Sequence, residues 1–92
     1  MPQIFRIGAF LVYFWANEGS PLEPIHVHIS KGIPTDNSTK VWITENGKCL
    51  LSNNNSLINQ KTLKNIMDVI EARNQDVLGK WFEYFGEIQY YC

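Results

Sequence analysis

The strongest constraint in this sequence of 92 residues is a single change of hydrophobic spacing near residue 55. Before that point, short apolar or alternating runs are separated by turn-forming residues, which is typical of β-strands. After it, apolar residues recur every three or four positions, which is typical of an amphipathic helix. This order predicts an α+β fold, with a small, mostly antiparallel sheet of four to five strands covered on one face by one or two C-terminal helices. We expect one domain spanning residues 1–92.

Two segments in the first third of the chain carry clear strand signals. The run 4–15 is predicted to be one strand, because residues 10–15 are β-branched or aromatic almost throughout. Its apolar side chains on both faces indicate a central or doubly covered strand, in which Gly8 marks a bend or bulge. Residues 25–30 alternate strictly between apolar and polar side chains, which is the clearest strand pattern in the chain. Proline- and glycine-containing loops separate these strands from each other and from the next element.

A hairpin is predicted in the middle of the chain. Residues 39–44 and 48–52 are expected to pair across the loop at 45–47, which contains the dipeptide Asn46-Gly47. Both residues of this dipeptide tolerate the positive φ angles of a type I′ turn, and Asn-Gly is therefore the strongest short hairpin signal.

The C-terminal third is predicted to be helical, with a strand at its end. The first helix has an apolar stripe made by Leu63, Ile66, Met67 and Ile70. Asn59 or Ser56 could cap it, and an apolar pattern over 77–85 continues it or forms a second helix that stops at Gly86. Residues 88–92 are expected to return to a sheet edge as a short strand.

Composition narrows the class of protein. The net charge of −1, from 8 basic and 9 acidic residues, lacks the basic footprint of a DNA-wrapping protein or of one that binds anionic membranes. No stretch approaches the roughly 20 apolar residues of a membrane span, and no signal peptide is recognisable. Cys49 and Cys92 do not form a disulfide framework. We expect a soluble, cytoplasmic protein with two reduced thiols.

The two histidines are the clearest candidates for catalysis. His26 and His28 are two positions apart on a predicted strand, so both imidazoles project to the same side, where they could act as acid and base or bind one metal ion. A zinc site needs at least three protein ligands, so the metal and any other cofactor stay open. Further ligands could come from Glu18, Glu23, Glu87 or Tyr90. The alternative interpretation is a polar strand face without a chemical role.

Four further residues are candidates for binding: Glu18, Lys31, Trp42 and Arg73. The cations, together with Lys40, could neutralise a phosphate beside the histidines. The neighbours of Trp42 in the sequence face the other side of the predicted hairpin. Trp42 therefore lies on a hairpin face that must expose some of its side chains to solvent. The aromatic residues of the chain could stack on RNA bases, although such residues more often fill the core.

The order of several short motifs resembles a known family. An opening Met-Pro-x-Ile and an apolar strand precede Asn17-Glu18, a proline-containing loop, and the run Pro24-Ile25-His26-Val27-His28. This arrangement resembles the small bacterial "domain of unknown function 4160" family. The insert at 19–23 lacks the additional histidine that many members carry, which argues against a three-histidine metal site in this chain. Members are often encoded beside another small protein in pairs that look like toxin–antitoxin modules, so the resemblance implies a small protein partner.

Three functions follow for testing. The first is an interaction component of a toxin–antitoxin-like two-protein module, as either toxin or antitoxin. The second is a ribonuclease or phosphodiesterase that uses His26 and His28, with or without a metal. The third is a nucleic-acid-binding domain, for instance for RNA, against which the near-zero net charge counts. Exposed edge strands could also pair in a homodimer.

Overall fold

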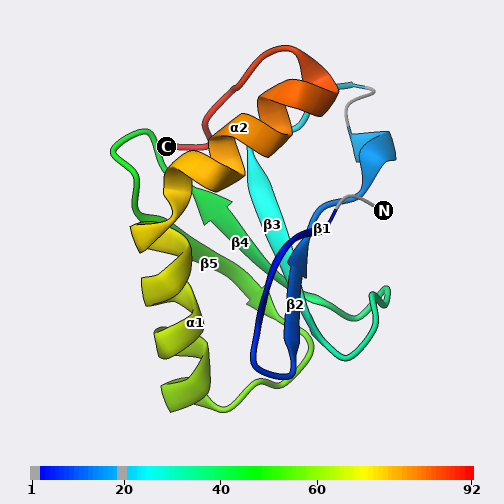
Figure 1. Ribbon diagram of the computed structural model, residues 1–92, viewed down its shortest axis with the longest axis vertical. Coiled ribbons are helices and arrows are strands. Elements are labelled where there is room, and N and C mark those ends of the chain that lie inside the picture. Colours follow the sequence, from blue (N-terminus) through cyan, green and yellow to red (C-terminus); the bar gives the residue numbers. More distant parts are fainter. Residues whose placement is uncertain (1–2, 19–20) are drawn as a thin grey trace.

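The computed structural model describes residues 3–18 and 21–92, except for the side chain of Glu18. Its elements are β1 (Gln3–Ile7), β2 (Phe10–Tyr13), β3 (His26–Lys31), β4 (Thr39–Ile43), β5 (Cys49–Asn54), α1 (Gln60–Ala72) and α2 (Asn74–Phe85). A 3₁₀ turn at Ala16–Glu18 follows β2. The strands form one sheet in the order β1-β2-β3-β4-β5, with every neighbouring pair antiparallel (Figure 1). The predicted α+β architecture is confirmed.

The N-terminal apolar run forms two strands, so the prediction of one strand was wrong. The chain reverses at Gly8 and Ala9, and Ile7 pairs with Phe10. Gly8 has a φ angle of 57°, a left-handed conformation that glycine adopts at little cost, which allows the tight reversal. Both halves of the run are apolar because both strands contribute to the core.

The predicted hairpin of β4 and β5 is confirmed, but its turn is of another type. Thr44 N–H donates to Lys48 O at 2.9 Å, and Gly47 N–H donates to Thr44 O at 3.0 Å. Of the loop residues, Gly47 alone has a positive φ, at 83°. A three-residue loop of this kind needs only its last residue to be left-handed, so Asn46 keeps an ordinary negative φ.

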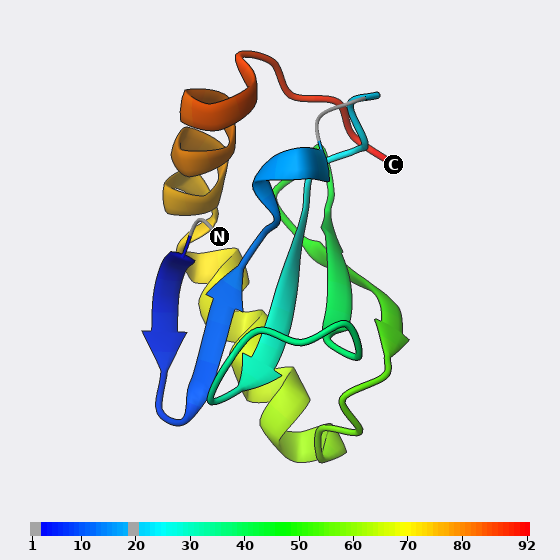
Figure 2. The same ribbon diagram turned by 90° about the vertical axis from the view of Figure 1, so that its right-hand side faces the viewer.

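The core lies between one face of the sheet and the two helices. Figure 2 shows α1 and α2 on the same side of the sheet. Leu63, Ile66 and Ile70 of α1, with Val77 and Trp81 of α2, are buried there. They pack with strand residues that include Val12, Ile25, Val27, Ile29, Val41 and Ile43.

The start of α1 and the end of α2 lie at residues whose types favour helix caps. The side chain of Asn59 accepts hydrogen bonds from the backbone N–H groups of Lys61 and Thr62, so Asn59 is the N-cap of α1. The hydroxyl of Ser56, the other candidate, instead donates to the carbonyls of Ile29 and Asn37. At the end of α2, Gly86 adopts a φ of 76°, and its N–H donates to Phe82 O at 2.8 Å.

The segment 88–92 is not a strand, so that prediction was wrong. It crosses the end of the sheet, where Ile25 N–H donates to Gln89 O at 2.8 Å and Glu45 N–H donates to Cys92 O at 3.0 Å. Both donors lie just outside the ends of β3 and β4, which already have strand partners on both sides. No free edge is therefore present at this place for a further strand to join. Within the described part of the chain, no helix is long and apolar enough to span a membrane.

Candidate functional site

The histidines lie on the sheet face opposite to the helices, which we call the open face. The strand register places Tyr13 of β2 beside His28, and Trp42 of β4 beside His26. Because side chains alternate along a strand, the intervening residues Val27 and Ile29 point to the core and the imidazoles lie on the open face. His26, at the first position of β3, also packs against Trp81 of α2. The prediction that both imidazoles share one face thus agrees with the register.

The loop between β3 and β4 helps to bury His28. The hydroxyl of Ser38 forms a hydrogen bond of 2.9 Å with Nδ1 of His28, and the ring of Tyr13 stacks on the imidazole with centroids 5.6 Å apart. The hydroxyl of Tyr13 also bonds to Ser30 Oγ at 2.9 Å. As a result, His28 is only 9% exposed and Ser38 only 5%.

His26 is enclosed more completely. Its Nδ1 lies 2.9 Å from the carbonyl oxygen of Pro24, and since a carbonyl can only accept, Nδ1 carries the proton and donates. The imidazole meets His28 edge to face, with centroids 5.0 Å apart, and Trp42 and Trp81 lie at 5.7 and 5.3 Å. His26 has an exposed fraction of 0%. At the end of the sheet, its ring is packed between Trp42 of the open face and Trp81 of α2.

Trp42 lies between a cation and an aromatic ring. Lys40 Nζ lies 4.3 Å from the Trp42 ring centroid, and Tyr91 stacks on Trp42 with centroids 4.7 Å apart and planes 6° from parallel. Lys40 Nζ also pairs with Glu23 Oε1 at 3.3 Å. The carboxylate of Glu23 is therefore paired with Lys40, and in this arrangement it does not join the imidazoles as a metal ligand.

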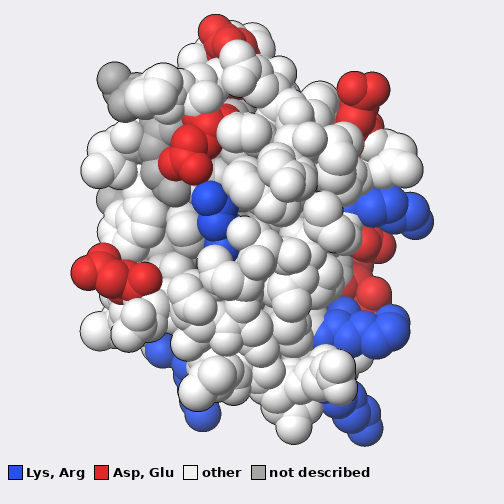
Figure 3. All heavy atoms as spheres, turned by 180° about the vertical axis from the view of Figure 1, so that it is seen from behind, with Lys and Arg blue, Asp and Glu red and all other residues white. Residues whose placement is uncertain are grey.

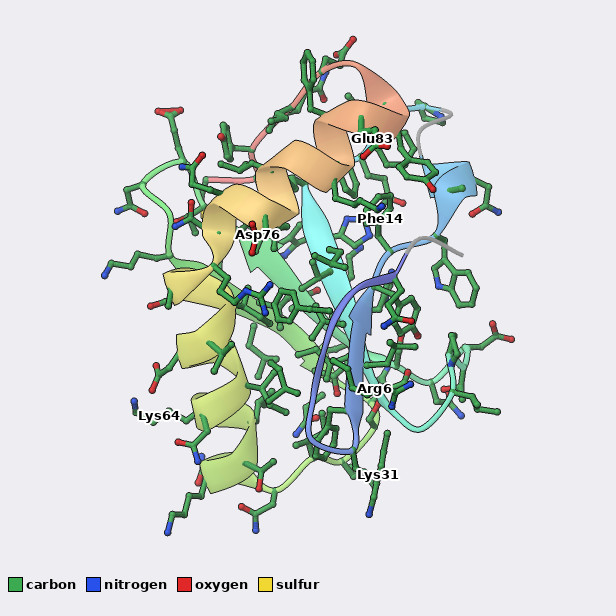
Figure 4. The ribbon with its side chains drawn as sticks, in the orientation of Figure 1. Arg6, Phe14, Lys31, Lys64, Asp76 and Glu83 are labelled. Atoms are coloured by element: carbon green, nitrogen blue, oxygen red, sulfur yellow. The ribbon has the colours of Figure 1, made fainter. Side chains whose placement is uncertain are left out.

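The other predicted binding residues lie elsewhere. Lys31 is at the far end of β3 from α2 (Figure 4), beside a hollow of about 390 Å³ that Phe10 and Leu57 help to line. Arg73 lies at the junction of the helices, where its Nε pairs with Asp76 Oδ2 at 3.0 Å and its guanidinium covers the ring of Phe5. The side chain of Glu18 is outside the described structure.

The structure thus brings together His26, His28, Trp42 and Lys40, and it leaves Lys31 and Arg73 apart from them. Sequence reasoning missed Ser38 and Tyr91 as neighbours of this cluster. No local signal marks either residue, because their contacts with His28 and Trp42 join distant parts of the chain. Tyr13 could have been found by pairing the two apolar strands in register.

The surroundings of the histidines limit the available chemistry. Among the residues 3–18 and 21–92 that are described, no three of His, Cys, Asp and Glu are grouped to hold a metal ion. Four of the surface hollows in the described part of the chain, of about 310 to 600 Å³, are lined by residues other than the two histidines. The largest of these four lies beside the β4–β5 turn, and its lining includes both cysteines.

The two thiols have contrasting environments. Burial, with the nearby carboxylates of Glu71 and Asp68, raises the pKa of Cys49 from 9.0 to about 12. Its Sγ donates to the carbonyl of Met67 at 3.7 Å, whereas Cys92 is exposed, and both are free cysteines. Cys49 thus stays a neutral thiol at ordinary pH and acts as a small packing residue.

The fold and the open face define a small α+β protein in which a histidine pair is packed within an aromatic cluster. Residues 9–82 match the model of the family described as Domain of unknown function (DUF4160). Because the match covers well over half of the chain, the protein belongs to the DUF4160 family. No match was found among the curated proteins or the solved structures.

Proposed function

We propose that this protein is the interaction component of a two-protein module of the toxin–antitoxin kind, and that its open face binds a small protein partner. The observation that carries this proposal is an aromatic patch made by Trp42, Leu50 and Tyr91. Leu50 pairs with Trp42 across the β4–β5 ladder, so both lie on the open face. Tyr91 is 60% exposed and Leu50 is 43% exposed.

Such a patch has the composition of a protein-binding surface. Aromatic residues are enriched at interfaces because a rigid ring buries a large area at little cost in conformational entropy. Figure 3 shows that the surface turned away from the helices is largely uncharged. Lys40 and Glu23, which pair with each other beside Trp42, add a local charged rim of the kind that surrounds apolar contact areas.

The geometry favours this role over the ribonuclease alternative. General acid–base catalysis requires an imidazole within hydrogen-bond reach of the substrate. His26 is fully buried, and His28 is used by Ser38 and Tyr13. Of the three cations that could neutralise a phosphate, Lys31 and Arg73 lie away from both rings, and Lys40, which lies beside them, is paired with Glu23. The net charge of −1 also favours a protein partner over a nucleic acid.

The test is to co-express the chain with a small protein from an adjacent gene, which is where the family resemblance places the partner, and to purify the complex through a tag on one of them. We expect a complex that survives gel filtration. Tyr91→Ser and Leu50→Ser should each weaken it, whereas Phe82→Ser on α2, where the replaced ring is 55% exposed, should leave it intact. If all three variants behave as the wild type does, the open face is not the binding surface.

A second measurement separates the toxin–antitoxin role from general association. Expression of one protein of the pair alone should slow growth, and co-expression should restore it. If slowed growth is accompanied by RNA cleavage that disappears in the His26→Ala/His28→Ala double variant while folding is retained, the ribonuclease role replaces the proposal made here.

A further inference from the structure

We infer that a second copy of this chain docks against the outer edge of β5 and the adjoining side of α1, which joins two sheets through their β5 strands. This inference does not rest on the proposed function, because it uses the outer edge of β5 and α1, whereas the aromatic patch, including Leu50 of β5, lies on the open face. Figure 2 shows β5 at one margin of the sheet, with no further strand beyond it. An uncovered edge strand exposes backbone groups that another strand can pair with.

The backbone of β5 is available at its centre. Thr44 and Lys48 form a hydrogen-bonded pair, so alternation along the antiparallel ladder directs the backbone groups of Cys49 and Leu51 outward. The outward N–H of Cys49 already donates to Glu71 Oε2 at 2.8 Å, which confirms the direction. Leu51 is the next residue with outward groups, and its side chain is 40% exposed.

A hollow of about 400 Å³ lies between this edge and α1. Its floor includes the apolar side chains of Leu51, Leu63 and Met67. Its rim includes Lys64, Asp68 and Glu71. An apolar floor with a charged rim suits burial against another protein surface.

The charges on α1 indicate that the occupant is a second copy. Lys61, Lys64, Asp68 and Glu71 follow one another at spacings of three and four, so they form one stripe along the helix. The stripe is basic in its first half and acidic in its second half. An antiparallel pair of α1 helices related by a two-fold axis near residue 66 places Lys64 opposite the partner's Asp68 and Lys61 opposite the partner's Glu71.

The same axis is compatible with strand pairing. Two β5 strands related by a two-fold axis perpendicular to the sheet pair in antiparallel fashion, and the surface is then self-complementary in the way that a symmetric dimer requires. Lys64 and Asp68 are 76% and 58% exposed, and among the described residues they pair with each other, at 3.1 Å, so both are accessible to a second copy.

The test is sedimentation of the full chain and of two charge-reversed variants across the micromolar range. We expect the wild type to dimerise, and Lys64→Glu and Asp68→Lys each to weaken the dimer by roughly tenfold or more, because each places like charges across the two-fold axis. An equimolar mixture of the two variants should restore dimers. In the mixed dimer, the new carboxylate at position 64 faces the new ammonium at position 68, and the remaining Asp68 faces the remaining Lys64.

The mixture makes the test independent of folding, since a variant that failed to fold would not be rescued by another. A wild-type chain that stays monomeric across this range overturns the inference. It is equally overturned by single variants that dimerise as tightly as the wild type, which would assign the dimer to another surface such as the aromatic patch.

Discussion

At the scale of single residues, the open face is held by side-chain hydrogen bonds between distant parts of the chain. Ser38 bonds to His28, Tyr13 bonds to Ser30, and all four residues are buried. When a buried polar group loses its hydrogen-bond partner, the free-energy cost of its desolvation is no longer offset. The histidines are therefore important for the stability of this face.

Replacing Ser38 by alanine should lower the free energy of unfolding by about 2 kcal/mol, because Nδ1 of His28 loses a buried hydrogen bond. Urea denaturation followed by tryptophan fluorescence measures this change. The control is Ser52→Ala at an exposed position, which should change stability by less than about 0.5 kcal/mol. Equal effects of the two substitutions would show that the Ser38–His28 bond contributes nothing.

The two thiols should react at very different rates. With its pKa raised to about 12, Cys49 remains protonated at pH 8, whereas Cys92 is exposed. Iodoacetamide at pH 8 should therefore modify Cys92 first, as peptide mass spectrometry would reveal. Faster modification of Cys49 in the folded protein would contradict the burial described here.

The same pKa difference predicts a loss of stability in alkali. The unfolded thiol ionises near 9.0, while the folded thiol keeps its proton up to about 12. The contribution of Cys49 is therefore fully present below pH 9 and is lost as the pH rises from 9 towards 12. A Cys49→Ala variant should show a weaker fall in stability over this range.

At the scale of elements, the sequence predicted the parts whose signals are local. The β4–β5 hairpin, the stripe of α1, its Asn59 cap and the stop at Gly86 all depend on neighbouring residues. The 4–15 run was misread because an apolar hairpin and an apolar strand have the same composition, and only the left-handed Gly8 distinguishes them. The segment 88–92 was misread because whether a segment can form a strand depends on a free sheet edge, which is a property of the whole fold.

The cap of α1 allows a direct test at this scale. Asn59→Ala removes the acceptor for two backbone N–H groups and should destabilise the protein by about 1 kcal/mol. Asn55→Ala, at an exposed position in the preceding loop, provides a matched control with an expected effect near zero. A destabilisation by Asn55→Ala as large as that by Asn59→Ala would show that the effect does not come from helix capping.

At the scale of the whole molecule, the sequence located part of the candidate site. The alternation of 25–30 placed both imidazoles on one face, and the hairpin placed Trp42 on the face that exposes an aromatic surface. The depth of burial was not predictable, because Ser38, Trp81 and Tyr91 reach the cluster from other elements. Lys31 and Arg73 were separated from the cluster for the same reason, since their positions depend on the packing of strands and helices.

The central claim is that the open face binds a protein partner, and hydrogen–deuterium exchange of the complex with a partner captured by co-expression tests it most directly. At equal concentrations, so that any dimer contributes equally, we expect partner binding to slow amide exchange at 41–50 and 87–92 and to leave α2 unchanged. Slower exchange confined to α1 and α2, or unchanged exchange on the open face, would contradict the account.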